Sequence, residues 1–121
     1  MTDKNKNILK VKKSIFIPFL EHIENIDDVK VIVKKYREKY KDSSHICWGY
    51  ILNENIFGCS DNGEPHGTAG LQILNVLKSK KKFNTMGIVV RYFGGTKLGC
   101  KILAESYRKA IENKIEYLEI H

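Results

Sequence analysis

The chain has 121 residues, of which 42% are hydrophobic and 29% are charged, and this composition is typical of a folded globular protein rather than a disordered one. The length suits one domain that buries a single core without disulfides or metal. No run approaches the roughly 18 apolar residues of a membrane span, and the lysine-rich N-terminus lacks the apolar segment of a secretory signal. We therefore expect a cytoplasmic protein.

The net charge is +7, from 21 basic and 14 acidic side chains. An excess of this size favours partners that carry negative charge, such as RNA, the ribosome or an acidic protein surface. A lysine-rich composition whose charges only solvate the surface explains the same excess. Composition alone leaves both explanations open.

The three cysteines are an odd number and form no C-x-x-C pair, which indicates free thiols in a reducing compartment. A structural zinc site lacks its ligands and their spacing. The one group of side chains suited to a metal is His45, Cys47, Asp61, Glu64 and His66. Roles without metal explain these residues better, so we predict no metal and no cofactor.

The N-terminal half begins with residues 1–12, which are polar and lysine-rich and are predicted to be a flexible basic arm before a single domain at 13–121. β-branched and aromatic residues predict a strand at 14–20. A helix follows, with Asn25 or Asp27 as its N-cap and apolar residues at steps of three and four. Its other face is an exposed basic stripe of Lys30, Lys34, Arg37 and Lys41.

The middle of the chain predicts a hairpin of two strands, at 46–52 and 56–60, joined by a short turn. After a glycine-rich loop, Thr68 is the predicted N-cap of a short buried helix at 69–78. The most apolar stretch, residues 86–93, predicts a central strand.

A last helix follows a second glycine-rich loop, and residues 114–121 fit either a continued helix or a final strand. The order β-α-β-β-α-β-α predicts an α+β domain of two layers, with the helices on one face of a mixed, mainly antiparallel sheet. The predicted inward face of the last helix consists of Ile102, Leu103, Ser106, Tyr107, Ala110 and Ile111.

Seven of the nine glycines lie in two windows, residues 58–70 and 94–99, and each window runs from a strand end to a helix start. A helix N-terminus offers unpaired N–H groups and the positive end of the helix dipole, and glycine lets another group approach them. Both junctions are therefore potential anion sites.

The second loop, within RYFGGTKLG, places Arg91, Gly94, Gly95 and Lys97 around the position of a phosphate. Its spacing is neither that of the P-loop nor that of the dinucleotide-binding glycine motif. The alternative is a tight turn whose arginine and lysine are solvated.

The first loop, SDNGEPHGTAG, carries Asp61 and Glu64, which either bind a cation or pair with Arg91 or Lys97 of the second loop. The acid–base groups nearby are His45, Glu64 and His66, but no serine or cysteine lies on a nucleophile elbow. Two half-buried strand residues explain His45 and Cys47 better than a catalytic pair does. We therefore name no catalytic residue and lean against an enzyme.

On these motifs the chain resembles the Impact family, which includes bacterial YigZ-like proteins and eukaryotic Impact translation regulators. The resemblance covers about residues 12–111. It rests on KSIFI (13–17), HIC (45–47), SDNGEPHGTAG (60–70), ILNVL (73–77) and RYFGGTKLG (91–99). Two departures are Asn62, where the family has a second acid, and Cys100-Lys101-Ile102, where it has a small residue and two glycines.

The resemblance implies a fold like the second domain of ribosomal protein S five, and a role near translation. Eukaryotic members regulate the stress pathway that phosphorylates an initiation factor, and nucleic-acid binding is the usual proposal for bacterial members. Fold transfers within a family more safely than biochemical role.

We therefore expect a binding module in translation or its regulation that contacts RNA, the ribosome or a translation-regulatory protein through both loops. The predicted ligand-binding or anion-binding residues are Gly67, Thr68, Arg91, Gly94, Gly95 and Lys97, supported by Asp61, Glu64 and His66, with His45 and Lys101 as further candidates. One alternative is an enzyme that acts on a phosphorylated small molecule in the same cleft. Another is a purely protein-binding regulator whose glycine loops are structural. The oligomeric state is left open.

Overall fold

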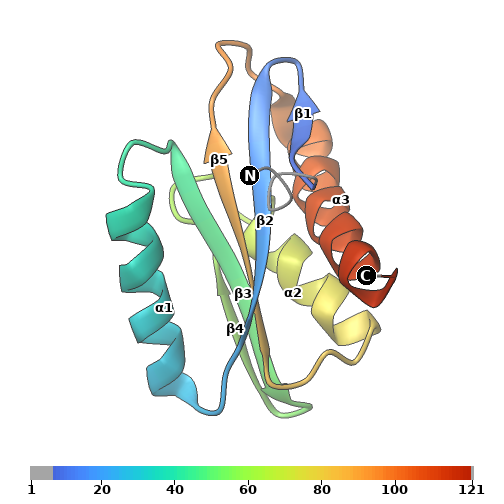
Figure 1. The fold of residues 1–121 in the computed structure, drawn as a ribbon. Coiled ribbons are helices and arrows are strands. Elements are labelled where there is room, and N and C mark those ends of the chain that lie inside the picture. Colours follow the sequence, from blue (N-terminus) through green and yellow to red (C-terminus); the bar gives the residue numbers. More distant parts are fainter. Residues whose placement is uncertain (1–6, 121) are drawn as a thin grey trace.

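The computed structural model describes residues 7–120, which form five strands and three helices (Figure 1). The strands are β1 (Leu9–Val11), β2 (Ser14–His22), β3 (His45–Asn53), β4 (Ile56–Ser60) and β5 (Thr85–Tyr92). The helices are α1 (Ile26–Lys39), α2 (Gly70–Ser79) and α3 (Gly99–Ile120). The predicted α+β class and the order of the elements from β2 to α3 are confirmed.

The strands form one sheet in the order β1-β2-β5-β3-β4, and each neighbouring pair is antiparallel. The predicted mixed sheet therefore has no parallel pair within the described residues. β5 lies at the centre between β2 and β3, as its apolar sequence predicted, and its residues from Met86 to Arg91 are all buried. The C-terminal end of β5 places Arg91 at one edge of the core.

The helices cover both faces of the sheet, not one face as the sequence analysis predicted (Figure 1). α1 packs with Ile46, Met86 and Ile88, whereas α2 and α3 pack with Cys47 and Val89. Neighbouring strand residues point to opposite faces, so these two sets belong to two separate cores. The reason lies in β5, which is apolar on both faces and needs a cover on each.

The two ends of the described chain are more regular than the sequence predicted. Leu9–Val11, in the predicted arm at 1–12, pair with β2 as strand β1, and Leu9 and Val11 pack against the core next to α3. Residues 1–6 of that arm lie outside the described residues. At the other end, α3 continues to Ile120 with Ile115 buried, which decides the open question of the tail in favour of helix. None of the helices in residues 7–120 is long and apolar enough to cross a membrane.

The start of α1 follows its sequence signal. Asn25 is the N-cap, and its side chain accepts a hydrogen bond from the N–H of Asp28 at 3.0 Å. The Asp28 carboxylate accepts in return from the N–H of Asn25, which completes a capping box. Of the two N-caps considered, Asn25 is therefore the correct one.

Gly49 of β3 allows α2 to lie directly on the sheet, because a Cβ at this position would come within 2.8 Å of the main-chain nitrogen of Leu74. We predict that Gly49→Ala lowers the free energy of unfolding by about 1–3 kcal/mol, since the helix must shift. Urea denaturation measures this loss. Gly58→Ala on β4 is the matched control, because the atoms nearest to its Cβ belong to the outer end of the Tyr50 side chain, which can move, and not to main chain. Equal losses for the two variants would contradict the account.

Candidate functional site

The two glycine-rich loops meet at one end of the sheet. We call residues 61–69, between β4 and α2, the acidic loop, and residues 93–98, between β5 and α3, the basic loop. Together with the strand and helix ends they enclose a cavity of about 410 Å³, here named the two-loop cavity. Its lining residues are His45, Glu64, Pro65, Arg91, Phe93, Lys97, Leu98, Gly99, Cys100 and Leu103.

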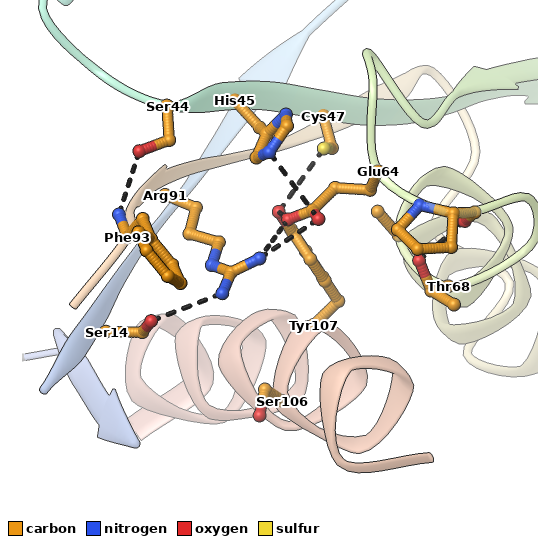
Figure 2. A network of polar contacts seen from close by, with 12 residues as sticks. Ser14, Ser44, His45, Cys47, Glu64, Thr68, Arg91, Phe93, Ser106 and Tyr107 are labelled. Carbon is orange, nitrogen blue, oxygen red and sulfur yellow. Dashed lines mark hydrogen bonds and ion pairs between the residues drawn. The ribbon is translucent and has the colours of Figure 1, made fainter. Parts of the chain in front are cut away.

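A buried ion pair between Glu64 and Arg91 forms the inner wall of this cavity (Figure 2). Arg91 Nη1 donates to the two carboxylate oxygens of Glu64 at 2.7 and 3.0 Å, and Nη2 donates to Ser14 Oγ at 3.2 Å. Glu64 is 8% exposed and Arg91 is 5% exposed. The predicted pairing of Glu64 with Arg91 is confirmed.

Tyr107 of α3 completes this group, because its hydroxyl donates to Glu64 Oε2 at 2.5 Å. Burial, and then the neighbouring Cys47 and Glu64, raise the pKa of the Tyr107 phenol far above its ordinary value, so it remains a neutral donor. The periodicity of α3 predicts Tyr107 only as a core residue, and no motif points to Ser14 as a site residue. The one available signal was that Ser14 belongs to the matching KSIFI stretch.

Asp61 has a different task from the one predicted for it. Its carboxylate accepts from the N–H groups of Gly67, Ala69 and Gly70 at 2.9, 3.1 and 2.8 Å. The cap of α2 is therefore Asp61, and the predicted N-cap Thr68 is wrong: its hydroxyl donates to the carbonyl of Pro65 at 2.6 Å. An ionised carboxylate with two oxygens satisfies three donors, which a single hydroxyl cannot do.

His45 on β3 points toward the ion pair (Figure 2). Its Nδ1 lies 2.9 Å from the main-chain carbonyl of Asn62, and because a carbonyl only accepts, Nδ1 carries the proton. Its Nε2 then faces Glu64 Oε1 at 3.6 Å, beside the cavity. His66, by contrast, is fully exposed, and its Nδ1 lies 4.0 Å from Asp61 Oδ2.

Cys47 is held as a structural thiol. It donates to the main-chain carbonyl of Asp61 at 3.1 Å and lies 3.4 Å from the Tyr107 hydroxyl. Burial raises the pKa of the Cys47 thiol to about 12, so it is protonated at neutral pH and is no nucleophile. Across residues 7–120, no three His, Cys, Asp or Glu side chains are grouped so that they could hold a metal ion.

The basic loop begins near one glycine that the fold requires, and exposed residues follow it. A Cβ on Gly94 would lie 2.1 Å from the carbonyl carbon of Lys13, so β5 can end beside the start of β2 only with glycine there. Gly95, Lys97 and Lys101 are exposed. Of the predicted site residues, Gly67, Thr68, Gly94 and Gly95 shape the loops rather than line the cavity, whereas Arg91 and Lys97 do line it.

Phe93 follows β5 and is 51% exposed at the cavity wall, with the Arg91 guanidinium 5.7 Å from its ring centre. Its neighbour Tyr92 is half-buried, packs against the α1 core and donates to Asp42 at 3.1 Å. The two aromatic residues therefore point to opposite sides, and Phe93 is the one available to a ligand.

We predict that Glu64→Ala lowers the free energy of unfolding by about 3–5 kcal/mol, because Arg91 is left charged and buried without its partner. Chemical denaturation measures the loss. The control is His66→Ala, which changes an exposed side chain of the same loop and should have little effect. The double variant Glu64→Ala with Arg91→Met should recover part of the loss; an unchanged stability of Glu64→Ala alone would refute the role.

We also predict that alkylation of the native protein near pH 8 modifies the exposed Cys59 and Cys100 but not the buried Cys47. The raised pKa of Cys47, about 12, keeps its thiol protonated over the whole range below that value. Peptide mass spectrometry distinguishes the three sites. Modification of Cys47 at the rate of Cys59, without unfolding, would contradict the buried position.

Comparison with known sequences points to one family. The Impact N-terminal domain family matches residues 12–115. The chain is 33% identical over 112 residues to the IMPACT family member YvyE of Bacillus subtilis, covering 91% of this chain and 52% of that protein. It is 32% identical over 113 residues to the IMPACT family member YigZ of Escherichia coli, covering 90% and 55%. The chain thus spans about half the length of these relatives.

Comparison with solved structures supports the same conclusion. A crystal structure of a hypothetical protein superposes with a TM-score of 0.85 at 31% identity, covering 90% of this chain and 55% of that one. The two-domain translational regulator Yih1 shares the fold, with a TM-score of 0.57 at 19% identity over 90% of this chain and 44% of that one. On the family match over residues 12–115, this chain belongs to the Impact N-terminal domain family.

Proposed function

We propose that this chain is a binding module in translation or its regulation and that it contacts RNA through the rim of the two-loop cavity. The link to translation is supported by one relative of the same fold, Yih1, which is described as a translational regulator. Protein IMPACT-B of Xenopus tropicalis and Protein IMPACT of Danio rerio are each 30% identical to this chain over 95 residues, covering 73% of this chain and 29% of each protein.

The observation that carries the RNA contact is the distribution of charge around the cavity. Glu64, the one carboxylate among its lining residues, is already paired with Arg91. The exposed lysines of the basic loop and of the first turn of α3 are Lys97, which lines the cavity next to the half-exposed ring of Phe93, and Lys101, which is not among the lining residues. Lysines that hold phosphates beside an aromatic ring that stacks on a base are a frequent arrangement in proteins that bind single strands.

The proposed site has two kinds of residue. Lys97, Lys101 and Phe93 contact the ligand. The predicted candidates that are buried or fixed in loops support them: Arg91 and Glu64 hold the inner wall, and Asp61 orders the acidic loop. The supporting set further includes Gly67, Thr68, Gly94 and Gly95 for loop shape, with His45 and His66 at the edge.

We predict that Lys97→Ala with Lys101→Ala weakens binding to generic single-stranded RNA at low salt and leaves the fold intact, because both side chains are exposed. The slope of log affinity against log salt should fall by about two, one for each lost phosphate contact. Fluorescence anisotropy at several salt concentrations measures both quantities. The control, Lys34→Ala with Arg37→Ala on α1, removes the same charge on the other face of the sheet. Equal losses for the two pairs would mean that only net charge matters.

An enzyme that acts on a phosphorylated small molecule is the second candidate, and the position of His45 favours it. Its Nε2 lies 3.6 Å from Glu64 at the cavity wall, where a histidine can act as a general base. Turnover of a phosphorylated compound that is lost in His45→Ala and is insensitive to salt would favour the enzyme. Affinity capture from cells that survives nuclease treatment would instead favour a protein partner.

A further inference from the structure

In the described part of the chain, α1 alone covers its face of the sheet, whereas α2 and α3 share the other face (Figure 1). Neighbouring strands lie about 4.8 Å apart and a helix is about 10–12 Å wide, so one helix covers roughly half of a five-stranded sheet. Trp48, Tyr50 and Leu52 of β3 lie on this face and are only half-buried. The rings of Trp48 and Tyr50 are neighbours, with centres 6.1 Å apart, so an apolar strip remains beside α1.

A groove of about 330 Å³ lies between α1 and this strip, and we call it the α1 groove. Its apolar lining residues are Val29, which is buried, and Val33 and Trp48, which are half-buried, so they form the floor. The cations that line the groove are exposed and all come from α1, where they form a basic rim. They are Lys30, Lys34 and Arg37.

The two flanks of α1 differ in their charge balance. On the flank toward β2, Lys35 pairs with Glu21 at 2.9 Å, so the protein supplies a carboxylate for this lysine. On the flank that forms the groove, none of the three cations of the basic rim has an ion-pair partner among residues 7–120. The rim is therefore open to carboxylates of another molecule, next to an apolar floor.

The spacing of the rim suits a helical partner. Lys30, Lys34 and Arg37 are four and three residues apart, so they lie along one side of α1 about one turn from each other. A second helix beside α1 that carries acids at the same spacing would face all three cations. Its neighbouring apolar residues would then meet Val33 and Trp48, which is the helix-in-groove mode of recognition.

An RNA strand fits the α1 groove less well. It has no aliphatic group to place against Val33, and its phosphates would approach Glu38, the one acid among the lining residues. The cations also lie on one side of the groove only, because they all come from α1. The combination of apolar floor and one-sided basic rim favours an acidic amphipathic peptide.

We propose that the α1 groove binds an acidic amphipathic helix of a partner protein. The carboxylates of this helix pair with the basic rim, and its apolar side chains cover Val33 and Trp48. The α1 groove shares no lining residue with the two-loop cavity. The site therefore goes beyond the proposed RNA contact and does not depend on it.

The first test uses the emission of Trp48, which is the one tryptophan of the 121 residues and reports directly on the groove. The probe is a synthetic peptide of 14 residues, the length of α1, with leucines at helical spacing and glutamates beside them. It should shift the emission saturably and bind at least about tenfold more tightly than versions with glutamine for glutamate or alanine for leucine. No shift, or equal binding of the three peptides, would overturn the proposal.

Exchange of the two pairs of exposed cations separates this site from the RNA contact. Lys34→Ala with Arg37→Ala should weaken peptide binding about tenfold and leave RNA binding nearly unchanged. Lys97→Ala with Lys101→Ala should leave peptide binding unchanged. All four side chains are exposed, so a loss in either pair does not come from unfolding. Equal peptide affinity in the two double variants would contradict the proposed site.

A matched pair of valines tests the floor of the groove. Val33→Asn places a polar group on the floor, whereas Val31→Asn makes the same change at a residue that is 68% exposed and does not line the groove. Peptide binding should weaken about five- to tenfold in the first variant only. Melting curves of both variants show whether the fold is retained. Full peptide affinity in a folded Val33→Asn protein would exclude docking on the floor.

Other occupants of the α1 groove give different results. If Trp48 emission changes with protein concentration alone and ultracentrifugation shows a dimer, a second copy fills the groove and the proposal is wrong. It is also wrong if RNA, and not the peptide, shifts the emission and Lys34→Ala with Arg37→Ala removes that shift. If the peptide binds as expected but RNA binding is insensitive to Lys97 and Lys101, the peptide site stands and the RNA contact fails.

Discussion

The ion pair between Glu64 and Arg91 fixes the relative position of four segments that are distant in sequence. It joins the acidic loop to β5, and through Ser14 and Tyr107 it reaches β2 and α3. A charge as deeply buried as Arg91 is tolerated only with a matched partner and further hydrogen bonds, so each segment has one acceptable position. The two-loop cavity exists because this buried group holds its inner wall.

This arrangement divides the basic residues of the site into two kinds. Arg91 uses the planar, fork-like geometry of its guanidinium to bind two oxygens and a hydroxyl inside the protein. Lys97 and Lys101 remain exposed, with flexible stems and compact charges. The fold therefore does not depend on Lys97 or Lys101, and these side chains are free to change their contacts without loss of the wall formed by Arg91.

Much of the fold could be predicted from the sequence because its signals are local. The periodicity of α1, the hairpin of β3 and β4, and the apolar run of β5 all occur within single elements. The face on which α1 packs could not be predicted, because β5 is apolar on both sides and either face would accept a helix. The capping of α2 by Asp61, nine residues before Gly70, and the roles of Ser14 and Tyr107 depend on contacts that no local pattern contains.

The position of β5 in the sheet also decides when the fold can form. β5 is the last strand in sequence, yet it lies between β2 and β3 and supplies the central pairings of both. Until β5 has joined the sheet, β2 and β3 have no strand between them. Both hydrophobic cores then lack the residues that β5 contributes. Such non-local pairing must close long loops before it gains stability, so folding is cooperative and late. During synthesis, the strands that precede β5 therefore cannot complete the sheet until β5 has been made.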